Sequence, residues 1–274
     1  MSPEINLEIL QPQVAGIFYP ASRENLLELL NNFFENCQLD KKNFNKNPKA
    51  IIAPHGGYLF SGSIAAEAFS ILKENKKIDQ VILLAPAHQL AFMGIATHQA
   101  NFFSTPLGEI KLNKNLIERA FNIPEVSYLD LAFLNEHTVE VILPFLQFTL
   151  GENFTLAPFI IGQCLTQGVL DLLNNLILNP EESEKTLIVV SSDLSHYQPY
   201  SIAKELDQLT QEQITRLQWD GLTQDDACGD VALKALLQLA DQENWRGECK
   251  VLKNSGDTVG EKDKVVGYGA FNFF

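Results

Sequence analysis

Short, strongly apolar segments alternate along the chain with longer amphipathic ones. Five apolar segments are predicted strands, at 50–54, 80–85, 154–161, 186–191 and 265–273, with weaker candidates near 92–97 and 248–253. Strands that are apolar on both faces are typical of a buried, mainly parallel sheet. Their alternation with amphipathic segments predicts an α/β fold in which helices cover that sheet.

Helices are predicted where apolar residues recur with a spacing of three to four. These segments are 22–36, with Ser22 as the N-cap, and 62–74, 137–149, 166–178, 201–217 and 228–242. The segment 104–112 is interpreted as an excursion from the sheet, and the basic run 41–49 as a solvated loop. Since no composition shift marks a boundary, residues 1–274 are predicted to form a single domain.

Charge and composition narrow the classes of function. The chain has 274 residues, 46% of them hydrophobic, which is enough for a large core, and a formal net charge of -14. This charge repels a phosphate backbone and an anionic membrane alike, so neither nucleic acid nor a membrane is an expected partner. No apolar run approaches the roughly 20 residues that span a bilayer, and the first residues lack the pattern of a signal peptide, so a cytoplasmic protein is expected.

The five histidines carry the main chemical signal. His55, His88 and His196 each follow a predicted strand, and His137 opens a predicted helix. Because the carboxyl ends of parallel strands meet at one edge of a sheet, the first three are expected to converge there. Such a cluster serves either metal binding or proton transfer. A single histidine after a strand is more often structural, and His98, which has no such company, is predicted to lie on the surface.

Acidic residues accompany these histidines. Asp193 and His196 are three residues apart, so they share a face if a helical turn starts there; the carboxylate then binds metal, orients the imidazole or caps that turn. Glu136 and Glu140 flank His137, where they either serve the site or favour a helix N-terminus through its dipole. Glu136, His137, Asp193 and His196 are the candidate catalytic residues.

Cys228 is the one notable thiol among four cysteines, which also include Cys37, Cys164 and Cys249. None of them forms a C-x-x-C pair, so neither disulfides nor a structural zinc knuckle are expected. Cys228 stands at the start of a predicted helix, where the helix N-terminus is expected to lower its pKa and favour a metal-binding or nucleophilic thiolate. The alternative is a small buried residue at a turn. The chain contains no G-x-S-x-G, Walker A or G-x-G-x-x-G motif.

Taken together, these motifs resemble those of the Memo family, whose microbial members are called AmmeMemoRadiSam system protein B. The resemblance covers the whole chain and rests on seven segments in order: AGIFYP (15–20), APHGGYLFSG (53–62), APAH (85–88), EHTVEVILPFL (136–146), SSDLSHY (191–197), ACG (227–229) and GYGA (267–270). Two details depart from the common family pattern: Ala-Pro-Ala-His replaces Gly-Pro-Ser-His, and Gly56 stands where alanine is frequent.

The resemblance implies a fold like that of the class III (LigB-like) extradiol dioxygenases, a three-layer α/β/α sandwich with a mainly parallel mixed sheet. It implies a metal pocket formed by His55, His88 and Cys228, lined by Asp193 and His196, that binds iron or copper in preference to zinc. The family lacks the carboxylate ligand of those dioxygenases, so ring cleavage does not follow from the fold.

Three functions are compatible with these residues. The first is a metal-dependent redox enzyme with an organic substrate. The second is a non-catalytic module that binds metal, a small molecule or a peptide in a former enzyme pocket. The third, a zinc hydrolase with Glu136 or Asp193 as its base, is disfavoured by the resemblance. The family name also implies a radical-SAM protein as a partner.

Overall fold

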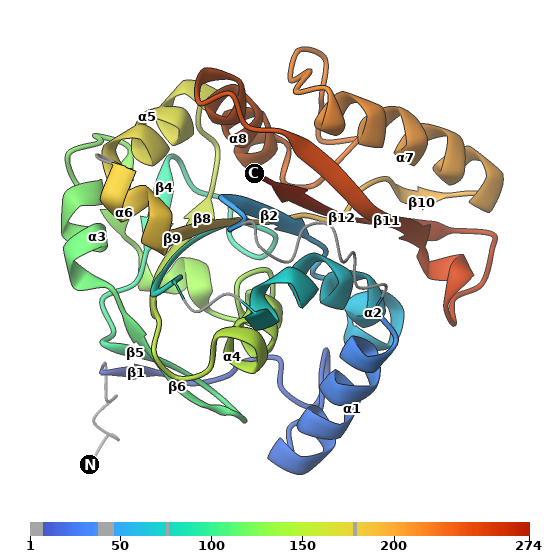
Figure 1. The fold of residues 1–274 in the computed structure, drawn as a ribbon, viewed down its shortest axis with the longest axis horizontal. Helices are drawn as coiled ribbons and strands as arrows, with labels where there is room; N and C mark the ends of the chain where they lie inside the picture. The colour runs from blue at the N-terminus through green and yellow to red at the C-terminus, as the bar shows by residue number, and fades with distance from the viewer. Residues whose placement is uncertain (1–7, 38–46, 75–76, 178–179) are drawn as a thin grey trace.

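The computed structural model describes residues 8–37, 47–74, 77–177 and 180–274, so most of the basic run 41–49 lies outside the described residues. A mixed sheet runs through the described part of the chain in the order β1-β5-β6-β8-β3-β9-β2-β12-β10, with β11 paired to β12, and β4 paired to β8 and β7 (Figure 1). The strands are β1 Ile9–Leu10, β2 Ala50–Ala53, β3 Gln80–Pro86, β4 Ile95–Thr97, β5 Phe102–Thr105, β6 Gly108–Leu112, β7 Val126–Tyr128, β8 Thr155–Ile161, β9 Thr186–Ser191, β10 His196–Gln198, β11 Gly247–Asn254 and β12 Val265–Phe273.

The centre of the sheet is parallel, as predicted. Strands β8, β3, β9 and β2 run in the same direction, and β12 closes antiparallel against β2. Every residue of β2 and β9 is buried, which explains why their sequences are apolar without alternation. The predicted α/β fold with a mixed, mainly parallel sheet between helices is therefore confirmed.

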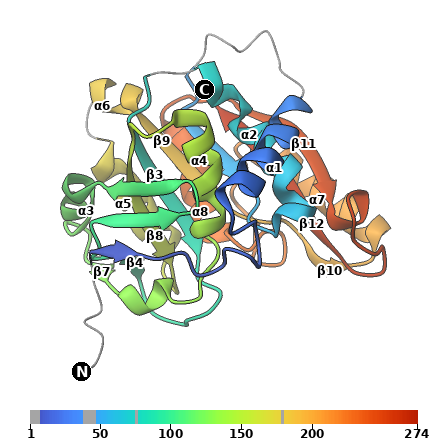
Figure 2. The ribbon, with the colours of Figure 1, turned by 90° about the horizontal axis from the view of Figure 1, so that it is seen from below.

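Helices cover both faces of the sheet. On one side α1 (Arg23–Glu35), α2 (Tyr58–Phe69) and α4 (Leu143–Leu150) pack together, and on the other α5 (Thr166–Leu176) packs against α3 (Lys114–Ala120) and α8 (Asp230–Gln242) (Figures 1 and 2). Helix α7 (Tyr200–Thr215) lies against β11 and β12, and α6 (Pro180–Lys185) precedes β9. Ser22 caps α1 as predicted, because its side chain accepts a hydrogen bond from the Asn25 N–H. No described helix has the length and apolar character required to cross a membrane.

Two boundaries and one segment differ from the predictions. Helix α2 begins at Tyr58, earlier than expected, and the helix predicted from 137 begins only with a short 3-10 turn at Glu140. The segment 104–112 is not an excursion: it contributes to the hairpin of β5 and β6, and β6 joins the sheet by pairing with β8. The sequence of this hairpin did not reveal its partner, which is distant along the chain.

The parallel strands set the position of the functional residues. β2, β9 and β3 are adjacent, with Ala53 paired to Ser191 and Leu84 paired to Val190. The segments that follow these strands therefore meet at one edge of the sheet, as in other open α/β folds. His55, His88 and Asp193 lie in those segments.

Candidate metal centre

His55 is held in one tautomer by the residues behind it. The side chain is only 1% exposed, and its Nδ1 lies 2.8 Å from the Ser191 hydroxyl oxygen. That hydroxyl donates its own hydrogen to the Thr138 carbonyl at 2.6 Å, so it accepts the hydrogen of His55 Nδ1. Nε2 is therefore left with a free lone pair. Burial, together with the neighbouring histidines, lowers the pKa of His55 well below its usual value, which keeps the ring neutral.

His88 faces the free nitrogen of His55. The two Nε2 atoms are 3.3 Å apart, and His88, unlike His55, is an exposed residue. Partial removal from water lowers the pKa of His88 as well, although Glu136 opposes this effect. Two neutral imidazoles that direct nitrogen atoms at one point are suited to a shared cation.

His137 completes the cluster. One ring nitrogen from each of His55, His88 and His137 lies within 4.8 Å of the other two, which is close enough for a single ion. Nδ1 of His137 is 3.3 Å from a Glu136 oxygen, an arrangement that leaves Nε2 available as a ligand. The His137 ring also stacks on Phe18, with centroids 4.5 Å apart and an interplanar angle of 28°.

The carboxylate of Glu136 connects the two loops that carry His88 and His137. One oxygen accepts the backbone N–H groups of His88 at 2.6 Å and Gln89 at 3.0 Å, and the other accepts those of His137 at 2.9 Å and Thr138 at 3.3 Å. Burial alone would raise the pKa of Glu136, but the contacts with His137 and with these backbone groups outweigh it and lower the pKa to about 2. Glu136 is thus an ionised group that orients two histidines.

Asp193 plays a comparable part for His55. Its Oδ1 accepts the His55 backbone N–H at 2.8 Å, and burial raises the pKa of this carboxyl to about 6 in spite of that hydrogen bond. No helical turn forms between β9 and β10, so Asp193 is not a helix cap and does not share a helix face with His196. The loop instead folds so that the carboxylate reaches back toward β2.

Cys228 lies beside the histidine cluster but differs in its expected ionisation. Its Sγ is 3.4 Å from His55 Nε2 and accepts the Asp193 backbone N–H at 3.3 Å. The predicted lowering of its pKa by the helix N-terminus is wrong: burial, reinforced by the charge of Asp193, raises the pKa of the thiol. The cysteine precedes the first residue of α8 by two positions, and desolvation dominates there.

His196 and His98 lie in surroundings that differ from those predicted. His196 begins β10, which pairs antiparallel with β12, and it is near enough to depress the pKa of both His55 and His88 without belonging to the group of three. The histidine that joins His55 and His88 is His137 instead.

His98 is not a surface residue: it is 6% exposed, and its Nδ1 accepts the Ala100 N–H at 2.9 Å.

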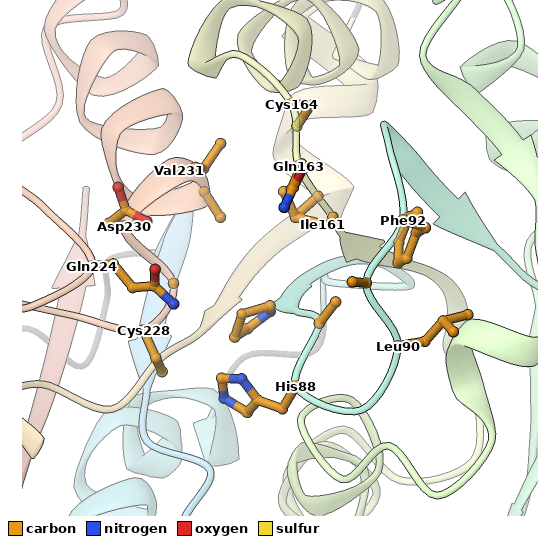
Figure 3. A pocket seen from close by; sticks show the side chains of 16 residues that line it. His88, Leu90, Phe92, Ile161, Gln163, Cys164, Gln224, Cys228, Asp230 and Val231 are labelled. Carbon is orange, nitrogen blue, oxygen red and sulfur yellow. The ribbon is translucent and has the colours of Figure 1, made fainter.

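A cavity of about 280 Å³ opens next to the cluster. His88 and Cys228 lie close together at one end, and Gln163 and Cys164 lie at the other (Figure 3). One wall contains Leu90 and Phe92, and the facing wall contains Gln224, Asp230 and Val231 (Figure 3). The exposed side of His88 is thus accessible to a small molecule.

Two residues that support the histidine cluster were not identified from the sequence. Ser191 fixes the tautomer of His55, and Phe18 packs on His137. The segment that carries Phe18 is anchored by Glu140, which accepts the backbone N–H of Val14 at 3.0 Å and the hydroxyl of Tyr19 at 2.6 Å. Ser191 and Phe18 belong to SSDLSHY and AGIFYP, so the motifs pointed to these segments without indicating which side chain acts.

The donor set fits a transition metal. Three imidazoles with an adjacent thiol sulfur suit copper, zinc or iron, whereas Mg²⁺ and Ca²⁺ prefer oxygen ligands. The hydrogen bonds of Ser191 to His55 and of Glu136 to His137 are of the kind that supports metal-binding histidines. A cluster able to hold a metal is therefore present.

Comparisons with known proteins agree with this site. Residues 11–272 match the family described as Memo-like protein. MEMO1 family proteins are similar over nearly their full length: that of Methanopyrus kandleri is 32% identical over 96% of this chain and 98% of its own, and that of Methanosarcina barkeri is 31% identical over 95% and 98%. A relative from Ignicoccus hospitalis is 31% identical over 96% of this chain and 97% of its own. With its full-length match and its clustered histidines in the expected motifs, the chain belongs to the Memo-like protein family.

Proposed function

We propose that the protein binds one Fe(II) or copper ion through His55, His88 and His137, with Cys228 as a further ligand, and uses it in redox chemistry on a small organic molecule. The observation that carries this proposal is the convergence of three imidazole nitrogens within 4.8 Å. For His55, whose Nε2 faces the Nε2 of His88 at 3.3 Å, the Ser191 hydroxyl at Nδ1 leaves this converging atom as a lone-pair donor. The contact of His137 Nδ1 with Glu136 leaves its Nε2 available for the same ion.

The residues behind the ligands determine how rigid the site is. Ser191 orients the ring of His55 and Glu136 that of His137, and Asp193 holds the backbone of His55. When bound, the ion would supply Lewis-acid and electron-transfer chemistry at a position open to the cavity. Its charge would also favour the Cys228 thiolate over the thiol, and a thiolate favours copper and iron over harder ions.

Asp193 and His196 are proposed to move protons for this reaction. A carboxyl with a pKa of about 6 exchanges its proton near neutral pH, which suits general acid–base catalysis. His196 is near enough to influence Asp193 electrostatically, and imidazole is the side chain most often used in general acid–base catalysis. Glu136 supports the ligands and is not assigned a proton in this proposal.

The test is metal content by elemental analysis of anaerobically purified protein, followed by dioxygen consumption with candidate reductants. We expect about one iron or copper ion per chain, lost in His55→Ala and reduced in His137→Ala and Cys228→Ser. Cys249→Ser is the matched control, because this partly buried cysteine lies on β11, away from the cluster, and should retain full metal content. Failure to take up Fe(II), Cu(I) or Zn(II) would contradict the proposed metal centre.

A further inference from the structure

A second depression adjoins the cavity beside the histidines. A groove of about 650 Å³, lined by Met93, Pro124, Ser127 and Leu165, shares Gln163 and Cys164 with the cavity. These two shared residues form the end of the cavity farthest from His88 and Cys228 (Figure 3). A ligand that is bound at the histidines and is long enough to pass Gln163 would therefore enter the groove.

The groove has an apolar rim that the fold itself does not bury. Met93 and Leu165 are 76% and 80% exposed. Two large apolar residues that flank one depression and remain exposed to water are typical of a binding surface. The backbone beside Met93 is nevertheless well held, because Met93 and Gln163 form a parallel bridge in which the Gly94 N–H donates to the Gln163 carbonyl at 2.9 Å and the Gln163 N–H donates to the Phe92 carbonyl at 2.8 Å. The surface is thus preformed and apolar.

The charged residues that line the cavity and the groove disfavour binding of an anion. Among the described residues that line the cavity and the groove, none is a lysine or an arginine, and the two carboxylates are Asp230 in the cavity and Glu125 in the groove. Asp230 is the first residue of α8 and already supplies negative charge where a helix N-terminus would attract an anion. Its partner Lys234, 2.7 Å away, is not among the lining residues.

We infer that the substrate of the proposed metal centre is an uncharged, elongated molecule. A polar head reaches His88 and Cys228, and an apolar tail passes Gln163 to lie between Met93 and Leu165. This inference rests on the proposed function only for the head, because the tail is placed by the cavity and the groove. It excludes substrates that carry a carboxylate or phosphate at the end remote from the metal.

The test uses straight-chain hydroxamic acids, whose head group binds metals, with four to eight carbons. Affinities are measured by calorimetry with metal-loaded and with metal-free protein. Full burial of one methylene group raises affinity about fourfold. An open groove that buries roughly half of each methylene group should raise affinity about twofold per group, or about sixteenfold between the four-carbon and the eight-carbon compound. The eight-carbon compound with a terminal carboxylate should bind at least about tenfold more weakly than its neutral counterpart.

Two variants locate the tail. Met93→Ser and Leu165→Ser should flatten the dependence on chain length, and neither threatens the fold, since both side chains are exposed and Leu165 occupies the N-cap of α5, where serine is favourable. Leu209→Ser on α7, 61% exposed, is the matched control and should leave the dependence unchanged.

Each outcome has a distinct meaning. An affinity that does not rise with chain length, a rise that persists in both groove variants, or equal binding of the carboxylate would overturn the inference. Equal affinities in metal-loaded and metal-free protein would refute the metal centre as the site of the head. The chain-length dependence would still decide the groove.

Discussion

Glu136→Gln provides a sensitive test of how the site is built. The substitution keeps the size of the side chain but replaces one carboxylate oxygen with an NH2 group, which cannot accept. Two of the four backbone N–H groups of His88, Gln89, His137 and Thr138 would then lose their acceptor. Because Glu136 is only 3% exposed, water cannot easily replace it.

Two estimates of the free energy lost in Glu136→Gln agree. Loss of two hydrogen bonds to a charged group costs about 3 to 6 kcal/mol. Independently, a pKa that falls from the model-compound value of 4.5 to about 2 corresponds to about 3 kcal/mol of preference for the ionised form. We therefore expect the free energy of unfolding of the variant to be about 3 kcal/mol lower at pH 7, and its metal affinity to be about 10- to 100-fold lower.

The pH dependence gives a second readout. A carboxyl with a lowered pKa in the folded state stabilises the protein above pH 4.5, and this contribution is lost as the pH falls toward 2. Urea denaturation from pH 7 to pH 3 should show this loss in the wild type and not in Glu136→Gln. The exposed Glu109→Gln is the matched control. Unfolding within about 1 kcal/mol of the wild type, with unchanged metal affinity, would refute the assigned role of Glu136.

Three further substitutions test other contacts. Ser191→Ala should lower metal affinity about tenfold in chelator competition, because His55 Nδ1 loses its acceptor; unchanged affinity would show that the tautomer is set otherwise. Asp207→Asn removes a carboxyl whose pKa is raised by burial to about 6. The free energy of unfolding of the variant, measured by denaturation, should therefore rise by up to about 3 kcal/mol relative to that of the wild type as the pH rises from about 4 to 6; a difference in unfolding free energy that does not change with pH would contradict the raised pKa. Tyr19→Phe deletes a hydrogen bond to the buried Glu140 and should lower the free energy of unfolding by about 1.5 to 3 kcal/mol, whereas thermal unfolding like that of the wild type would argue against an anchor there.

The strands of the central sheet were predictable because they are buried on both faces and almost wholly apolar. The placement of His55 and His88 at one edge followed from the carboxyl ends of β2 and β3. His196 was expected to complete the set because it follows β9, but the intervening residues run on into an antiparallel strand. Proximity along the chain to a strand end did not decide which third histidine converges.

His137 was seen in the sequence but placed at the start of a helix. The regular helix begins later, with a 3-10 turn at Glu140, and the backbone N–H groups of His137 and Thr138 donate to Glu136 instead. The error about His98 has a similar origin, since its burial depends on a local hydrogen bond to Ala100 and on packing against Phe133. In both cases contacts with residues that the local sequence does not reveal decided the outcome.

The same dependence explains why metal-binding competence cannot be read from the ligand residues alone. His55 presents Nε2 because Ser191 accepts from Nδ1, and Ser191 accepts only because its own hydrogen is directed to the Thr138 carbonyl. Thr138 is in turn held by the carboxylate of Glu136, which also positions His88. The state of one imidazole thus depends on contacts among segments far apart in the sequence. A chain that kept the histidines but lost this network would retain the ligands without the fixed orientation, and its affinity for metal should fall accordingly.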